Sequence, residues 1–348
     1  MPLKKFWQTL ESLPGLAAIT AEWRALLGTD YDAVRGFLQP TTREATAYRS
    51  PQPGRNCVHK VVKHGPGDYV GVCPNGCGPV SLLKSDVIIY ELDTAVLGRA
   101  VAQALSIEHT QSPVASLPKT ARIGTYAPYA GFRFPVYLTI RAEPDEFGQA
   151  IHGLMASTDG PFILLAPTRE LCKPASEELL KHRKASLLPL SEILALDRRG
   201  RFVLADGLTI DTILADFRSA VLPPVDDQSG MIFFPTPPDA RWENVTIRFR
   251  DGHTLSVNVG GVSQVCDYTK MGMADGRNGN PTKQWELLRD FAEAHGHFDW
   301  SNRKAGRTKQ KQRETLADNL RAFLRIEGDP FVAEGTGWRA RFAVSFGE

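Results

Sequence analysis

Residues 135–165 read PVYLTIRAEPDEFGQAIHGLMASTDGPFILL, and this stretch decides the class of fold. The apolar run at 135–140 predicts a buried strand, and 162–165 predict a second one. Between them, 145–156 has the apolar spacing of a helix. Because a strand, a helix and a strand follow one another at short intervals, we expect a small parallel α/β layer fold.

The alternation continues beyond this stretch, with a helix expected at 176–183, a short strand near Leu187 and a helix around 193–194. Two predicted linkers border the α/β segment. The first, 111–129, is rich in Ser, Pro, Thr and Gly and lacks helical periodicity, and the second, 222–239, contains five prolines. Prolines at that density exclude a central strand or a helix.

The linkers predict a multidomain α/β chain of three segments. The first, 1–115, is expected to be a helical region with a small, zinc-ribbon-like β element, and the second, 125–221, is the α/β domain. The third, 240–348, begins with alternating apolar residues on both sides of an Asp-Gly pair, which predicts a β-hairpin. Two helices are expected after it, at 282–295 and 308–326.

Composition excludes several classes of protein. Of the 348 residues, 42% are hydrophobic and 23% are charged, which is ordinary for a globular protein and excludes a disordered or fibrous one. No apolar run approaches the roughly 18 residues of a membrane span. The first residues contain no apolar signal core, and the five cysteines form no disulfide framework. We therefore expect a cytoplasmic protein without a membrane partner.

Three cysteines in the first segment indicate a metal site. The strands on either side of a Gly-Pro-Gly turn are expected to pair in a register centred on Gly65, which would place Cys57 opposite Cys73. Cys77 follows Cys73 through a tight Pro-Asn-Gly loop. Three thiolates would then converge, and Zn²⁺ prefers four nitrogen or sulfur ligands in a tetrahedron.

The fourth ligand is chosen by its position. His59 is two residues from Cys57 and faces the same side of the strand, whereas His64 lies at the turn, roughly 23 Å away along the strand. We therefore expect a structural zinc ion held by Cys57, His59, Cys73 and Cys77, unless an unseen ligand replaces the histidine. Buried thiols, or a cross-strand pair of Cys57 and Cys73, would explain the same cysteines without a metal.

Other motifs give no convincing catalytic site. Ala166-Pro-Thr-Arg-Glu-Leu171 resembles the strand-end motif with which DEAD-box helicases contact a nucleic-acid backbone, but no phosphate-binding glycine-rich loop accompanies it. We interpret it as an ordinary turn from strand to helix. His295, His297 and Asp299 fall where the helix at 282–295 ends, and the helix dipole favours histidine there. No catalytic residue is therefore assigned.

Positive charge is concentrated in one part of the chain. Residues 301–326 contain eight basic and two acidic side chains, a net charge of +6, whereas the whole chain carries only +2. The helix expected at 308–326 has one narrow apolar stripe, formed by Leu316, Leu320, Phe323 and Leu324. Its remaining surface carries basic and amide side chains, which suit contact with phosphates and with base edges in a major groove.

Two stretches carry a resemblance to a known family. Asn319-Leu-Arg-Ala-Phe-Leu324 matches the core of a recognition helix, and Gly335-Thr-Gly-Trp-Arg-Ala-Arg-Phe342 matches a glycine- and aromatic-rich wing. With the order of elements around them, residues 240–346 resemble the winged helix-turn-helix effector domain of OmpR/PhoB-type response regulators. The resemblance implies contact with double-stranded DNA by Arg307, Lys309, Lys311, Gln312, Arg313, Arg339 and Arg341.

The function implied by this resemblance is that of a DNA-binding transcriptional regulator. A homodimer fits this function, because a lone winged helix buries little surface on DNA. Two alternatives stay open. One is an enzyme, or an enzyme subunit, that acts on nucleic acid through an unrecognised active site within 125–221, and the other is an adaptor that binds only proteins.

Overall fold

The chain forms two compact units. Unit 1 contains Met1–Tyr126 and Phe134–Ala220, and unit 2 contains Ala127–Arg133 and Val221–Glu348. Both units combine helices with sheets, which confirms the prediction of a mixed α/β chain with more than one compact part. The computed structural model describes residues 3–13, 15–49, 57–223, 231–299 and 307–347. Within these ranges no helix is both long enough and apolar enough to cross a membrane.

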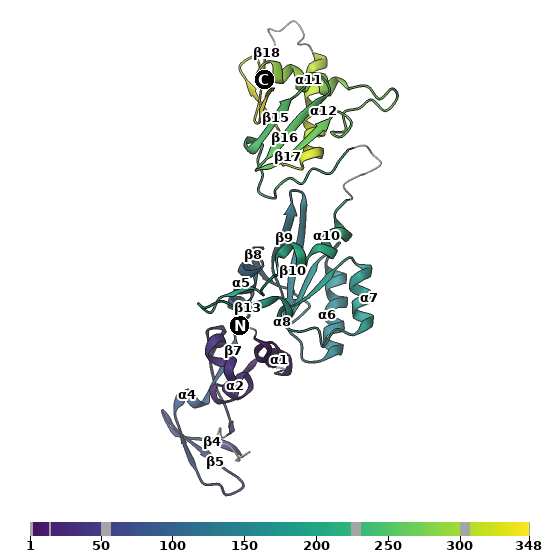
Figure 1. Ribbon diagram of the computed structural model, residues 1–348. Helices are drawn as coiled ribbons and strands as arrows, with labels where there is room; N and C mark the ends of the chain where they lie inside the picture. Colours follow the sequence, from purple (N-terminus) through teal and green to yellow (C-terminus); the bar gives the residue numbers. More distant parts are fainter. Residues whose placement is uncertain (1–2, 14, 50–56, 224–230, 300–306, 348) are drawn as a thin grey trace. The chain divides into compact units, whose positions relative to one another are not determined.

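A five-stranded sheet forms the centre of unit 1, in the order β12-β11-β10-β9-β8 (Figure 1). Strands β10, β11 and β12 are parallel, as the sequence predicts, because a helix returns the chain between each strand and the next. The elements of this layer are β8 (Glu108–Pro113), β9 (Thr120–Tyr129), β10 (Phe132–Thr139), α6 (Pro144–Ser157), β11 (Ile163–Ala166), α7 (Pro174–His182) and β12 (Ser186–Pro189).

Helices α6 and α7 pack on one face of this sheet. In α6, Phe147, Ile151 and Leu154 recur every three or four residues, so all three lie on one side of the helix. That side is buried in one cluster with Leu164 of β11 and Leu180 of α7. Strand β11 is buried along its whole length, as is typical of a parallel strand covered on both faces.

The prediction of a linker at 111–129 is wrong, because two strands occupy this stretch. β8 and β9 pair antiparallel, with Glu108 opposite Thr125. β8 is an exposed edge strand, which explains its linker-like polar composition, whereas β9 is largely buried. Through this pairing, most of the predicted segments 1–115 and 125–221 belong to one unit and not to two.

The rest of unit 1 consists of short elements, which include a three-stranded sheet β1-β7-β2 and a two-stranded sheet β13-β14. The first segment is helical at its start, as expected. The bounds are α1 (Lys4–Ser12), β1 (Ala17–Ile19), α2 (Thr20–Leu27), η1 (Gly28–Asp30), α3 (Tyr31–Val34), η2 (Arg35–Phe37), β2 (Leu38–Glu44), α4 (Lys84–Val87), β7 (Ile88–Leu92), α5 (Thr94–Ala104), α8 (Leu190–Ile193), β13 (Leu194–Leu196), β14 (Phe202–Leu204), α9 (Ile210–Ile213) and α10 (Ala215–Val221).

A small antiparallel sheet carries the three clustered cysteines. Its strands, in spatial order, are β3 (Ala47–Arg49), β4 (Val58–Gly65), β5 (Asp68–Val72) and β6 (Val80–Leu82). The predicted β4–β5 hairpin is present, but its register differs from the prediction by two positions, since Lys60 pairs with Val72. The reason is that the turn closes between Gly65 and Asp68, with Gly67 at a φ of 82° that glycine adopts without strain.

Unit 2 contains two small sheets and two long helices. The sheets have the strand orders β17-β16-β15-β21 and β18-β20-β19. The predicted first hairpin is confirmed, with Phe249 of β15 opposite Leu255 of β16. The bounds are η3 (Trp242–Asn244), β15 (Val245–Phe249), β16 (Thr254–Val259), β17 (Val262–Asp267), α11 (Lys283–Glu293), β18 (His297–Asp299), α12 (Arg307–Leu324), β19 (Phe331–Glu334), β20 (Gly337–Ala340) and β21 (Ala343–Phe346).

The core of unit 2 lies between its helices and its sheets. The four apolar residues predicted as the buried stripe of α12 are all fully buried, in one cluster with Trp285, Leu288 and Phe291 of α11. A helix-turn-helix would place its other helix between β18 and α12. Residues 300–306, which fill that interval, lie outside the described residues.

Arg325, just after α12, joins three separate parts of unit 2. Its guanidinium donates hydrogen bonds to the carbonyl oxygens of Ala130 (3.0 Å), Phe323 (3.3 Å) and Phe234. It also lies 4.3 Å from the ring centre of Phe233. Burial lowers the pKa of Arg325 to about 10, so the side chain is still charged at neutral pH. The chain segment Ala127–Arg133 is thereby fixed to the rest of unit 2.

Candidate functional site

The three cysteines of the small sheet lie close together. Cys57 precedes β4, Cys73 follows β5, and Cys77 lies in the loop before β6. Their sulfur atoms all lie within 4.8 Å of one another, and Sγ of Cys57 is 2.8 Å from Sγ of Cys77. Sulfurs around one tetrahedral zinc ion would be about 3.8 Å apart, given Zn–S bonds of about 2.3 Å. The predicted convergence is confirmed, and the three thiols are close enough to hold one metal ion.

The cysteines meet by a different route from the predicted one. Because the β4–β5 ladder is shifted, continuing it by one pair places His59, and not Cys57, level with Cys73. The predicted Cys57–Cys73 cross-strand pair is therefore wrong. Cys57 lies three positions before Lys60, the first paired residue of β4 in this ladder. Cys77 returns towards it through a loop that turns at Gly76, where φ is 73°.

His59 is buried in the same small sheet, but its ring nitrogens do not belong to the cluster of ligand atoms formed by the three cysteines. Its side chain is 2% exposed, and its Nδ1 atom has no hydrogen-bond partner among the described residues. The ring centre lies 6.5 Å from that of Tyr48 on β3, and Gly71 of β5 leaves room for the imidazole. A buried nitrogen without a partner is costly, and it is available as a ligand. His64 is exposed near the turn.

Hydrogen bonds within the cluster shift the pKa values of two thiols in opposite directions. Backbone N–H groups, first that of Cys77 and then that of Asn75 at 3.4 Å, lower the pKa of Cys73. Hydrogen bonds with Cys57 and Cys73 raise the pKa of Cys77 to about 12. A cation at the centre of the three sulfurs would favour the thiolate form of each.

Two of the predicted DNA-binding cations of α12 form ion pairs with carboxylates of unit 2. Lys309 lies 3.1 Å from Asp290 of α11, and both side chains are less than one-fifth exposed. Arg313 lies 2.8 Å from Asp329, and its guanidinium lies 5.8 Å from the ring centre of Trp338 on β20. These contacts connect the first turns of α12 to α11 and to the β19–β20 hairpin.

Other cations of this helix are exposed. Lys311 is exposed and has no ion-pair partner in the described part of the chain, and Gln312 is half-buried. The backbone of Arg307 begins α12, but its side chain lies outside the description. Further along, Glu314 and Asp318 are exposed on the same helix, and Arg321 in its last turn pairs with Asp318. Most of the positive charge of α12 therefore lies in its first two turns.

The two predicted wing arginines are exposed, and each forms an ion pair with a glutamate. Arg339 of β20 lies 3.7 Å from Glu334 of β19. Arg341 lies 2.9 Å from Glu243 of η3. Exposed ion pairs of this kind contribute little to stability and exchange readily for other anions.

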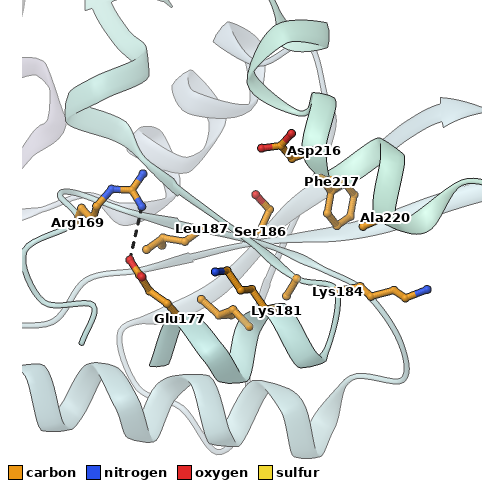
Figure 2. Close-up of a pocket in the computed structure, with 11 residues that line it drawn as sticks. Arg169, Glu177, Lys181, Lys184, Ser186, Leu187, Asp216, Phe217 and Ala220 are labelled. Carbon is orange, nitrogen blue, oxygen red and sulfur yellow. Dashed lines mark ion pairs between the residues drawn. The ribbon is translucent and has the colours of Figure 1, made fainter. Parts of the chain in front are cut away.

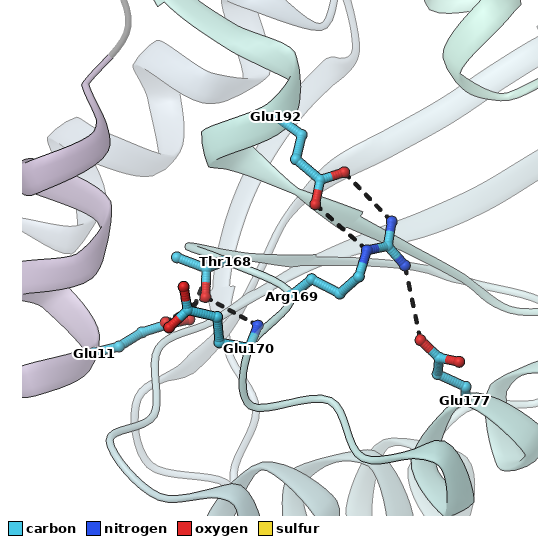
Figure 3. A network of polar contacts seen from close by, with 6 residues as sticks. All are labelled: Glu11, Thr168, Arg169, Glu170, Glu177 and Glu192. Carbon is cyan, nitrogen blue, oxygen red and sulfur yellow. Dashed lines mark hydrogen bonds and ion pairs between the residues drawn. The ribbon is translucent and has the colours of Figure 1, made fainter.

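Sequence reasoning missed a polar network at the carboxyl end of β11 (Figure 3). Glu11 of α1 is buried and accepts hydrogen bonds from Thr168, from the backbone N–H at 3.0 Å and from the hydroxyl at 2.5 Å. Arg169 binds both oxygens of Glu192 at 3.4 Å and lies 3.8 Å from Glu177. The six-residue motif at 166–171, interpreted above as an ordinary turn, thus anchors α1 and α8 to the sheet.

A cavity of about 380 Å³ lies on unit 1, lined by residues of α7, β12 and α10 (Figure 2). No sequence motif indicated it, because α10 is separated from α7 and β12 in the chain and meets them only in the folded protein. The lining residues are Arg169, Glu177, Leu180, Lys181, Lys184, Ala185, Ser186, Leu187, Asp216, Phe217 and Ala220.

Comparison of this chain with models of protein families, with curated proteins and with solved structures gives no match.

Proposed function

We propose that unit 2 binds double-stranded DNA and that the protein is a DNA-binding transcriptional regulator. The observation that carries the proposal is the position of α12. The helix is buried on one side against α11, and its first turns are tied to the β19–β20 hairpin by Arg313 and Trp338. A helix presented beside a hairpin, after a small antiparallel sheet, is the arrangement with which winged helices enter a major groove.

The charges support a contact at one end of the helix. In the helix-turn-helix mode, the N-terminal residues of the recognition helix contact the bases, and four of the five cations of α12 lie in its first two turns. Lys311 is exposed there, and Gln312, the next residue, is half-buried. Arg339 is exposed on the β19–β20 hairpin. The side chains of Lys309 and Arg313 are largely buried and pair with carboxylates, so we assign them mainly to holding the helix in place. Arg341, like Arg339, is exposed, and its ion pair can exchange for a phosphate.

The test is binding of the full chain to a random-sequence DNA duplex, followed by fluorescence anisotropy between about 50 and 200 mM salt. We expect affinity to fall steeply with salt, and Lys311→Ala to reduce the log–log slope by about 1. Lys270→Ala is the matched control, because Lys270 is an exposed lysine of the same unit in the loop after β17. It should leave the slope unchanged.

Three outcomes would count against the proposal. Absence of binding at the lowest salt would favour an adaptor that binds only proteins. Preference for duplex RNA over duplex DNA of the same sequence would indicate a different nucleic-acid target. Turnover of either nucleic acid would favour an enzyme with its active site in unit 1.

We also propose that the cysteine cluster holds a structural zinc ion, with His59 as the fourth ligand. Sulfur and imidazole donors are those that zinc prefers, and four protein ligands close the site to water. The unpaired Nδ1 of His59 supports the choice, since a metal bond would satisfy this buried atom. In a sheet with few buried residues, such an ion would add stability to the folded state.

A further inference from the structure

The cavity on unit 1 has the size and the lining of a small-molecule site. Its volume of about 380 Å³ falls within the range of roughly 300–1,000 Å³ found for ligand pockets. All its lining residues belong to unit 1. Neither the metal cluster nor the basic helix contributes to it, so it is independent of the function proposed above.

One wall of the cavity is apolar and held in place. Phe217 of α10 is buried and packs edge-to-face on Phe134 of β10, with ring centres 5.0 Å apart. Leu180 of α7 is buried in the core between α6, α7 and the sheet. Leu187 of β12 is the third large apolar residue of the lining. A ring or another flat apolar group would find a preformed surface there.

Three polar side chains without partners border the same space. Lys181 comes from α7, Ser186 from β12 and Asp216 from α10, and in the described part of the chain none of these side chains makes a hydrogen bond or an ion pair. Figure 2 shows Ser186 between Lys181 and Asp216. The ammonium and the hydroxyl are donors, and the carboxylate is an acceptor.

The other two cations of the lining, Arg169 and Lys184, do not compete with Lys181 for a ligand. Arg169 is already held by Glu192 and Glu177, so its planar fork is not available for a carboxylate. Lys184 borders the cavity, but its side chain extends away from the other labelled groups in Figure 2. Lys181 is therefore the cation of the lining that can bind an anionic ligand. A lysine ammonium acts as a point charge, and it commonly binds phosphate.

We propose that this cavity binds a ring-bearing phosphate monoester, of which a nucleoside monophosphate is the simplest representative. The phosphate accepts hydrogen bonds from Lys181 and Ser186, and the ring packs on Leu187 and Phe217. Asp216 accepts a hydrogen bond from a hydroxyl or amino group, as carboxylates do from the ribose of bound nucleotides. The site binds the ligand, and we assign it no chemical step.

The experiment is isothermal titration calorimetry of the full chain with AMP, GMP, CMP and UMP. We expect at least one of them to bind once per chain, with a Kd below about 1 mM. Adenosine, which lacks the anion, and inorganic phosphate, which lacks the ring, should each bind at least about tenfold more weakly. Lys181→Gln should weaken binding of the nucleotide about tenfold, and Ser186→Ala about threefold.

Lys184→Gln is the matched control, because it removes the same charge from the same cavity rim and should change the Kd less than about twofold. All three substituted residues are at least partly exposed, so the variants are expected to fold, and a thermal melt of each checks this. Absence of binding by all four nucleotides at about 5 mM would overturn the proposal. So would equal weakening by Lys181→Gln and Lys184→Gln, or tighter binding of phosphate alone.

Discussion

Glu11 and Thr168 are 157 residues apart in the chain, yet both oxygens of the Glu11 carboxylate accept hydrogen bonds from Thr168. The pair connects α1 to the carboxyl end of the central strand β11 (Figure 3). Burial raises the pKa of Glu11 above its ordinary value of 4.5, although the two hydrogen bonds act in the opposite direction. The folded protein therefore favours the protonated form of this carboxyl more than the unfolded chain does.

This shift predicts how the stability contributed by Glu11 depends on pH. A carboxyl whose pKa is raised on folding contributes stability that is fully present below its unfolded pKa and is lost as the pH rises through its folded pKa. Urea unfolding of the wild type and of Glu11→Gln, which does not titrate, measures the difference. We expect the wild type to gain relative to the variant when the pH falls from about 7.5 to about 4. A constant difference across this range would contradict the prediction.

Removal of one thiol is expected to release the metal. The purified wild type should contain about one zinc ion per chain by elemental analysis, and Cys73→Ser should lose it, since an anionic thiolate ligand contributes more to zinc affinity than a neutral imidazole. Cys172→Ser, which changes a partly exposed thiol outside the cluster, is the control and should keep the ion. A metal-free wild type with an intact β3–β6 sheet would rule the zinc site out.

The role of His59 is tested separately from that of the cysteines. His59→Ala should lower zinc affinity by at least about tenfold while Cys57, Cys73 and Cys77 still bind the metal. The readout is competition with a chromogenic chelator, which does not depend on any activity of the protein. Unchanged affinity would indicate that another group fills the fourth position.

Substitutions of Arg313 and Lys311 are expected to have different effects: the first should lower stability, and the second should weaken only DNA binding. Arg313→Ala removes the contacts with Asp329 and Trp338, and the Arg313 side chain is only 15% exposed, so we expect a loss of about 1–3 kcal/mol in the free energy of unfolding. Lys311→Ala should change stability by less than about 0.5 kcal/mol. Thermal melts of both variants give the comparison, and equal melting temperatures would refute the structural role of Arg313.

Arg325 allows a test of backbone strain and of side-chain contacts at one position. Its φ is 56°, in the left-handed region that favours glycine. Arg325→Ala loses three hydrogen bonds and keeps the strain, so unit 2 should lose about 3 kcal/mol of stability. Arg325→Gly loses the same contacts but relieves the backbone, and should be about 1 kcal/mol more stable than the alanine variant. If the two variants are equal, strain at this residue is absent.

The parts of the fold that the sequence predicts well are those fixed by neighbouring residues. The run at 135–140 and the spacing of Phe147, Ile151 and Leu154 determine a strand and a helix by themselves, and both are present. The stripe of α12 is correct for the same reason. In each case, burial of an apolar pattern leaves few other structures open.

The predictions that were wrong concern features that depend on residues distant in the chain or on the geometry of a turn. The register around the cysteines follows from where one turn closes, at Gly65 and Asp68, and a shift of a single residue in that turn moves every pair. The polar strand β8 resembles a linker until β9 is known to lie beside it. Lys309 likewise looks like a free cation because Asp290, its partner, lies on another helix.

Unit 2 is formed by two segments that are separated in the chain, Ala127–Arg133 and Val221–Glu348, and this affects the order of folding during synthesis. Ala130 is bonded to Arg325, which the ribosome adds 195 residues later, so about 10 to 40 seconds pass between them at 5–20 residues per second. During that interval Ala127–Arg133 is exposed without its final neighbours, while the strands on both sides of it are already complete. Unit 1 can thus finish folding early, and unit 2 must wait until synthesis has passed α12.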